Sequence, residues 1–270
     1  MDNKITRKIV AIGGGENGRV GSGGEKKPYE TFEIDQEIVK LSGKDKPHFL
    51  LLAHSQIPWG EEREIRYFDT MKKIYGEKFG CECRLLKISE LRADFSKAIA
   101  DVEWADIIYE GGGATYDMIN LWRETGFDEI LKQAWENGKV MCGISAGAIA
   151  WFSMGNTADP QFINDEYNKV EGLDLVDAYL IPHCQVEHRY ESAKRSLKYA
   201  NKVGIHLSNC VAVEIIDDSY RIITSTPYDP NFKPYALKTY WYKGEYIDEK
   251  LQATKQFQPL TELVNKQEHV

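Results

Sequence analysis

The stretch that decides the fold is Lys139–Trp151, with the sequence KVMCGISAGAIAW. A short apolar run enters the pentapeptide GISAG, which has Ser145 at its centre, and an apolar, helix-compatible segment follows. The pattern G-x-S-x-G between a strand and a helix is typical of a nucleophile elbow. A nucleophile at the top of a strand needs a strained turn, and flanking glycines leave room where a Cβ would clash. The alternative is an ordinary strand–turn–helix joint in which Ser145 caps the helix.

The second candidate is a histidine, because a serine hydroxyl is a poor nucleophile without a general base. His183 ends the apolar run Ala178–Pro182, whereas His188 and His206 fall in segments predicted as helix or loop. Open α/β sheets carry their chemistry at strand tips, and hydrolases of this type place the base after the nucleophile. We therefore expect activity to fall as the pH drops through the ordinary histidine pKa of about 6.5. A structural histidine that caps the strand is the alternative.

A run of three glycines is the third feature. It follows the predicted strand Ala105–Tyr109 and precedes a predicted helix over Tyr116–Glu124. Glycines at that point let backbone N–H groups face a ligand. Gly112 and Gly113, with the N–H of Ala146, would then form an oxyanion hole. The alternative is a flexible turn.

Three motifs together resemble the dipeptidase E (α-aspartyl dipeptidase) family of serine peptidases: GISAGA around Ser145, GGGATY from Gly111, and IPH ending at His183. That family includes cyanophycinase and is similar in fold to class I glutamine amidotransferase domains. The resemblance covers about residues 8–225. It implies a flavodoxin-like, mostly parallel sheet with helices on both faces, and cleavage of a small peptide amide by a Ser-His-acid mechanism. The residues to which it assigns roles are Ser145 as nucleophile, His183 as base, and Gly112, Gly113 and Ala146 as the oxyanion region.

The third triad member is missing from its expected place. The stretch after His183 that matches the family's acidic position is Gly204–Asn209, which contains no carboxylate. An orienting group need not be acidic, since Asn serves in some cysteine peptidases. We expect it within Ser208–Glu214 rather than in the loop that carries Asp159. The candidates are Asn209, Ser208, Glu214 and Asp159.

The missing acid keeps two rival functions open. One is an amidotransferase-like domain with weakened catalysis that serves in binding. The other is an esterase-type α/β hydrolase that uses the same serine turn.

Composition bounds the class of protein. Hydrophobic content of 42% and charged content of 28% are ordinary for a soluble enzyme, and a net charge of −8 argues against a nucleic-acid partner. No apolar run is long enough to span a membrane, and the run after the N-terminus is too short for a signal-peptide core. The five scattered cysteines favour reduced thiols and a cytoplasmic location. The expected partner is a small peptide substrate, and the sequence also allows a homodimer.

Two further motifs do not predict a cofactor or metal. Gly13–Gly18 satisfies G-x-G-x-x-G, but the composition of Arg19–Pro28 is that of a loop, where a dinucleotide site needs a helix. We expect this loop to line the active site or to be mobile. His183 and His188 are five residues apart across a strand-to-helix boundary, so with Cys184 and Glu187 they do not predict a metal site.

Strand-like and helix-like segments alternate over the first two-thirds of the chain, which predicts α/β architecture with a parallel sheet. From Cys210 onward strands follow one another, with a hairpin around Lys243-Gly244. We expect an amidotransferase-like peptidase domain over 1–225, and a β-hairpin and tail over 226–270 packed on it. The predicted strands are Lys8–Ile12, His48–Ala53, Cys83–Lys87, Ala105–Tyr109, Lys139–Gly143, Ala178–Pro182, Val211–Ile216, Tyr220–Thr224, Lys238–Tyr242 and Glu245–Asp248. The predicted helices are Thr31–Leu41, Glu61–Phe79, Ile88–Ala100, Tyr116–Glu124, Phe127–Asn137 and His188–Lys202.

Overall fold

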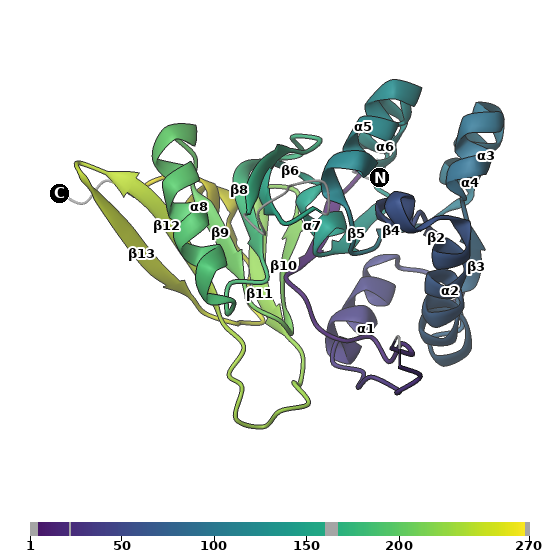
Figure 1. Cartoon of the computed structure of the whole chain (residues 1–270), viewed down its shortest axis with the longest axis horizontal. Coiled ribbons are helices and arrows are strands. Elements are labelled where there is room, and N and C mark those ends of the chain that lie inside the picture. Colours follow the sequence, from purple (N-terminus) through teal and green to yellow (C-terminus); the bar gives the residue numbers. More distant parts are fainter. Residues whose placement is uncertain (1–4, 22, 160–166, 268–270) are drawn as a thin grey trace.

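The computed structural model describes residues 5–21, 23–159 and 167–267, and its strands form two sheets that lie side by side (Figure 1). The larger sheet has the strand order β14-β11-β10-β1-β5-β4-β2-β3, and the smaller has the order β13-β12-β9-β8-β6-β7. A large, mostly parallel sheet with helices confirms the predicted fold class. The second sheet was not predicted.

The parallel part of the larger sheet contains five strands. Their side chains are buried on both faces: in β1, Ile9 and Ala11 enter one core cluster, whereas Val10 and Ile12 enter the other. Burial on both faces explains why these strands are short, continuous apolar runs rather than alternating ones. The strands are β1 (Lys8–Ile12), β2 (His48–Leu51), β3 (Glu82–Leu85), β4 (Ile107–Glu110) and β5 (Val140–Ile144).

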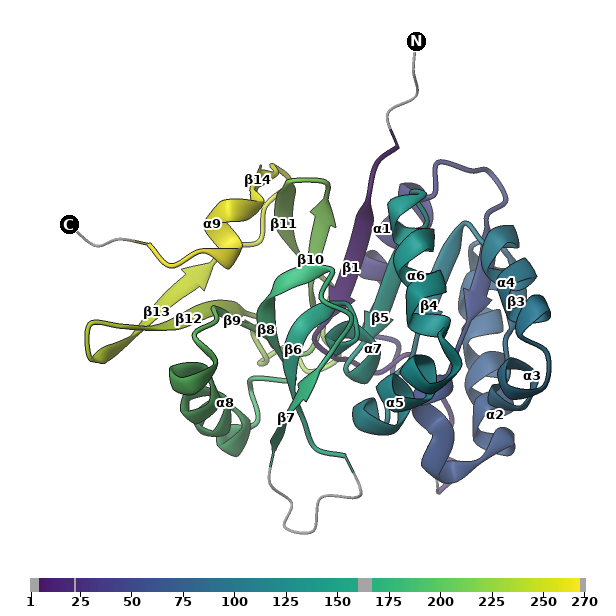
Figure 2. The ribbon, with the colours of Figure 1, turned by 90° about the horizontal axis from the view of Figure 1, so that it is seen from above.

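Helices cover both faces of this sheet (Figure 2). One face is covered by α1 (Phe32–Leu41), α2 (Glu61–Met71) and the π-helical segment η2 (Lys72–Lys78). The 3-10 helix η1 (His54–Trp59) lies between β2 and α2 in the chain. The other face is covered by α3 (Ile88–Ala93), α4 (Phe95–Trp104), α5 (Thr115–Thr125) and α6 (Phe127–Glu136). The sequence predicted α3 and α4 as one helix. They are separate because Asp94 is extended and caps α4 by accepting hydrogen bonds from Ser96 N and Lys97 N.

The strand that ends at His183 lies in the second sheet, which corrects its predicted place in the larger one. This strand, β8 (Val176–Pro182), is parallel to β6 (Phe152–Thr157) and β9 (Gly204–Leu207). The sequence did not predict β6, β9 or the edge strand β7 (Asn168–Glu171). His206, expected in a helix or loop, is buried in β9.

Helix α8 (Glu187–Ala200) covers this sheet, because Ala193 and Leu197 pack against Tyr179 and Ile181 of β8.

The chain crosses from the second sheet back to the first between β9 and β10 (Val211–Ile216), which pairs antiparallel with β1. The hairpin expected around Lys243-Gly244 joins β12 to β13, and β12 pairs with β9. The division at residue 225 stays a prediction. The remaining elements are β11 (Ser219–Thr224), β12 (Ala236–Tyr242), β13 (Glu245–Leu251), β14 (Gln258–Pro259) and α9 (Leu260–Val264). Among the helices of the described residues, none has the length and apolar character needed to cross a membrane.

Candidate active site

Ser145 occupies a strained turn between β5 and the one-turn helix α7 (Ala146–Ile149). Its backbone has φ 57° and ψ −111°, a conformation that costs a non-glycine residue free energy. The glycines on either side are required by packing. A Cβ on Gly147 would lie 2.2 Å from the carbonyl oxygen of Glu110, and one on Gly143 would lie 2.8 Å from the same atom. The GISAG pattern therefore lets α7 pack directly on the end of β4.

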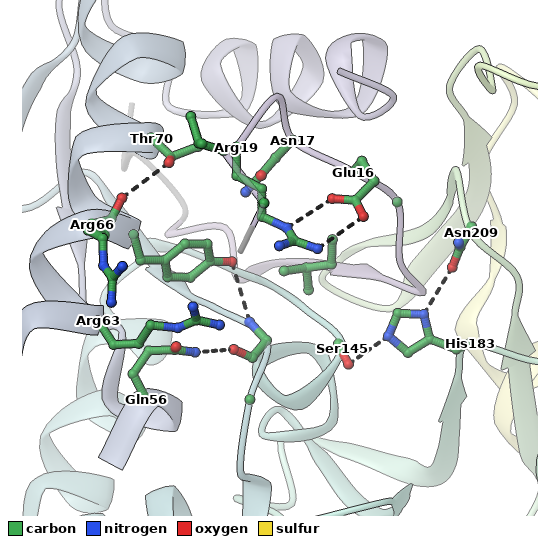
Figure 3. A pocket seen from close by; sticks show the side chains of 17 residues that line it. Glu16, Asn17, Arg19, Gln56, Arg63, Arg66, Thr70, Ser145, His183 and Asn209 are labelled. Atoms are coloured by element: carbon green, nitrogen blue, oxygen red, sulfur yellow. Dashed lines mark hydrogen bonds and ion pairs between the residues drawn. The ribbon is translucent and has the colours of Figure 1, made fainter. Parts of the chain in front are cut away.

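His183 follows β8 and brings its imidazole to Ser145 from the second sheet (Figure 3). Its Nε2 lies 2.7 Å from Ser145 Oγ, and its Nδ1 lies 2.9 Å from Asn209 Oδ1. An amide oxygen can only accept, so Nδ1 carries the proton and donates it to Asn209. Nε2 is then the acceptor for the Ser145 hydroxyl. This is the tautomer that a general base requires.

Among the candidates for the orienting residue, the structure brings only Asn209 to the imidazole. Glu214 is buried in β10, where its carboxylate lies 2.7 Å from Arg221 Nε. Asp159 caps α5 instead, since its carboxylate accepts hydrogen bonds from the N–H groups of Thr115 and Tyr116. In the described part of the chain, no carboxylate contacts His183.

Ser208 also points elsewhere. Its hydroxyl accepts a hydrogen bond from Tyr235 N and donates one to the carbonyl of Asn209.

The environment of His183 keeps its imidazole neutral. Burial and then the nearby Arg189 guanidinium lower the pKa of His183 to about 4, against a hydrogen bond to Asn209 that raises it. Arg189 is itself fixed, because it donates to Pro182 O at 2.7 Å and to Asn156 O at 3.0 Å. The sequence predicted a pKa for His183 near the ordinary value of about 6.5, and the structure places this pKa lower.

The Gly111–Gly113 turn brings the amide of Gly112 to the pocket. Gly111 O accepts a hydrogen bond from Gly147 N at 2.9 Å. The N–H of Gly112 lies on the opposite edge of the same trans peptide, so it points away from Gly147 and towards Tyr67 Oη, 3.4 Å away. The Ala146 N–H begins α7 and has no acceptor within that helix. Gly113 is required by packing, because a Cβ there would lie 2.3 Å from Ser55 O.

A buried carboxylate that the sequence analysis did not single out fixes the Gly111–Gly113 turn. Glu110 has no exposed surface, and its side chain accepts from the N–H groups of His54 at 3.1 Å, Ser55 at 3.2 Å and Gly111 at 2.9 Å. Burial raises the pKa of Glu110 to about 7, although the N–H donors lower it. The sequence signal for this role is the position of Glu110 directly before the three glycines.

The loop after β1 forms part of the pocket wall. A Cβ on Gly14 would lie 2.3 Å from both Asn209 Oδ1 and His183 Nδ1, so this glycine lets the backbone pack against the His183–Asn209 pair. Six of the following residues line the pocket with Ser145: Gly15, Glu16, Asn17, Arg19, Val20 and Gly21. Close packing therefore explains the first glycines of the G-x-G-x-x-G pattern. No group of three or more metal-binding side chains occurs in the described residues, which exclude the side chains of Glu187 and His188.

The pocket has a volume of about 420 Å3 and is rich in arginine, although the chain carries a net charge of −8. The Arg19 guanidinium is paired with the Glu16 carboxylate through contacts of 2.9 and 3.0 Å. Arg63 and Arg66 of α2 also line the pocket, and no described residue pairs with their guanidinium groups. The sequence analysis missed these two arginines, since charged residues on an amphipathic helix are normally solvated.

The chain is similar to several known peptidases. The model of peptidase family S51 matches residues 20–223. An uncharacterized peptidase, YgaJ of Bacillus subtilis (strain 168), is 32% identical over 217 residues, which are 78% of this chain and 84% of the relative. A peptidase from an acI-B1 Actinobacterium has a similar crystal structure, with a TM-score of 0.70 at 16% identity over 94% of this chain and 98% of that one. A putative peptidase E from Listeria monocytogenes EGD-e gives a TM-score of 0.57 at 15% identity over 81% and 98%.

Proposed function

The chain belongs to peptidase family S51, and on that premise we propose that it is a serine hydrolase that cleaves a small peptide amide through an acyl-enzyme. One observation carries the proposal: Ser145 Oγ lies 2.7 Å from His183 Nε2, while Nδ1 of the same ring lies 2.9 Å from Asn209 Oδ1. Ser145 is the nucleophile, His183 the general base and Asn209 the residue that orients it.

The reaction runs in two halves. Ser145 Oγ attacks the carbonyl carbon as its proton passes to His183 Nε2, which is neutral over the working range because its pKa is about 4. The Gly112 and Ala146 N–H groups stabilise the oxyanion. When the C–N bond breaks, Nε2 returns the proton to the leaving amine. Water then attacks the acyl-enzyme with the same base, and Ser145 is regenerated.

The substrate's acyl residue carries an acidic side chain in this proposal. His183 protonates the leaving amine, so the leaving group lies beside it and the acyl part extends towards the opposite end of the pocket. Arg63 and Arg66 lie at that end (Figure 3). Two exposed guanidinium groups that pair with no described residue and line the pocket match a carboxylate in charge and geometry.

The first experiment is labelling with a fluorophosphonate, which reacts with an activated serine. We expect the wild-type chain to be labelled and Ser145→Ala to be neither labelled nor active. The melting temperature should be nearly unchanged, because a turn serine contributes little packing. An unlabelled wild-type chain would favour a binding domain without catalysis.

The second experiment is a panel of dipeptides with Asp or Asn as the acyl residue. Arg63→Gln and Arg66→Gln should raise KM for the Asp peptide about 10-fold or more, since each charge-assisted hydrogen bond is worth about 1.5–3 kcal/mol. The matched control is Arg92→Gln, which changes an exposed arginine of α3 outside the pocket. An equal loss on Asn and Asp peptides would contradict the assignment of the arginines to the substrate carboxylate.

A further inference from the structure

Tyr67 is the side chain that lies directly over the Gly111–Gly113 turn. Its ring packs on Gly111 so closely that a Cβ there would lie 1.8 Å from Tyr67 Cε1. Its hydroxyl oxygen is 3.4 Å from Gly112 N and accepts the N–H that the proposed mechanism uses for the oxyanion. Tyr67 and Ser145 line the same pocket. The phenol therefore lies beside the amide that the proposed mechanism uses to bind the oxyanion.

The hydroxyl of Tyr67 still has a proton to donate. It accepts from Gly112, and no described residue accepts its own O–H. Burial raises the pKa of Tyr67 above its ordinary value, so the phenol stays protonated wherever the enzyme operates. A half-buried donor that faces the pocket and has no acceptor among the described residues can bind an oxygen atom of the substrate.

The distances allow Gly112 and Tyr67 to bind one oxyanion together. The observed separation of 3.4 Å is long for an N–H···O hydrogen bond, so the contact between them is weak. Two donor atoms at that separation can each lie roughly 2.7–3.0 Å from a third atom. An oxyanion at that third position can receive the N–H of Gly112 and the O–H of Tyr67.

We propose that Tyr67 is a catalytic residue whose hydroxyl donates a hydrogen bond to the oxyanion of the tetrahedral intermediate. This inference rests on the proposed serine hydrolase function and adds a side-chain donor that the sequence analysis did not identify. The O–H bond stays intact in this role, because the hydroxyl donates a hydrogen bond and transfers no proton.

The test is Tyr67→Phe, which removes the hydroxyl and keeps the ring on Gly111. We expect kcat on a cleaved dipeptide to fall about 100-fold, with KM changed little, because one oxyanion donor is lost. Affinity for a peptide boronate, which forms a tetrahedral adduct on serine, should fall by a similar factor. Affinity for the uncleaved dipeptide, measured in the Ser145→Ala background, should not change.

The matched control is Tyr246→Phe, which removes a hydroxyl that donates to Lys194 O at 2.8 Å, outside the pocket. It should leave kcat and boronate affinity at the wild-type values. A Tyr67→Phe variant with wild-type kcat would overturn the inference, and so would one that weakens substrate and boronate binding equally. Failure of the proposed function is distinguishable, because the wild-type chain would then show no fluorophosphonate labelling at Ser145.

Discussion

Replacing Asn209 with aspartate tests whether a neutral group orients His183. The substitution keeps the shape of the side chain, which matters because Gly14 packs within contact of Asn209 Oδ1 and His183 Nδ1. It places a carboxylate where the amide oxygen now accepts from Nδ1 at 2.9 Å. The proton stays on Nδ1, so the tautomer is unchanged, and only the charge facing the ring differs.

The size of the expected pKa shift of His183 follows from the negative charge of the new carboxylate. An opposite charge within hydrogen-bond distance raises a histidine pKa by roughly 1–3 units, and one unit corresponds to about 1.4 kcal/mol. In the wild-type chain the pKa of His183 is lowered to about 4 by burial and by Arg189. We expect the Asn209→Asp value to rise by about 2 units. The same interaction stabilises the imidazolium in the transition state, and 2 units correspond to about 2.8 kcal/mol, so kcat should increase by up to about 100-fold on the plateau.

The assay is kcat/KM as a function of pH on a neutral dipeptide, so that the added charge does not repel the substrate. The activity of the wild-type chain should fall only as the pH drops through about 4, because protonation of His183 removes the base. In Asn209→Asp this fall should occur at higher pH. Asn209→Ala is the comparison: it leaves Nδ1 without its acceptor and should lower turnover by as much as about 10⁴-fold. The proposed role of Asn209 is refuted if the Asn209→Asp variant stays folded and its kcat/KM falls at the same acidic pH as that of the wild-type chain.

Two further substitutions probe the residues around the Ser145–His183 pair. Glu110→Gln turns an amide N–H2 towards a backbone donor and should cost about 1–3 kcal/mol in the free energy of unfolding, measured by denaturant titration. Because the folded pKa of Glu110 is raised to about 7, its contribution to stability is full below the unfolded pKa and is lost as the pH rises through about 7, and the variant should lack this dependence. Gly14→Ala places a Cβ 2.3 Å from His183 Nδ1, so kcat should fall far more than the melting temperature; wild-type kcat would contradict the described packing.

The strands of the larger sheet were predictable because burial on both faces demands a continuous apolar run. β1 and β10 have the predicted bounds. The second sheet was harder to predict, since β6 contains Gly155 and follows α7 almost at once, and β9 has only four residues and includes a buried histidine. Tertiary pairing with β8, rather than local propensity, makes strands of both.

The residues of the candidate site also differ in how well the sequence predicts them. Ser145 and the Gly111–Gly113 turn were predictable because close backbone packing leaves no room for a Cβ, and glycine therefore appears at fixed positions in the sequence. Asn209 could be proposed only as one of several residues, since its role depends on where the connection from β9 to β10 passes. Arg63 and Tyr67 carried no sequence signal: both belong to an ordinary amphipathic helix, and only the packing of α2 turns them into the pocket.

The position of the site at the boundary between the sheets has a physical consequence. Ser145 extends from β5 of the larger sheet, His183 from β8 of the smaller, and Asn209 from the connection that crosses between them. A shift of one sheet against the other would therefore change the distance from Oγ to Nε2 directly. The close packing of Gly13 on Leu207 and Ser208, where a Cβ would lie 2.5 Å from either carbonyl oxygen, opposes such a shift. The close packing of the glycines after β1 thus helps to hold Ser145 and His183 at their observed separation, which is a reason for glycine there that requires no bound nucleotide.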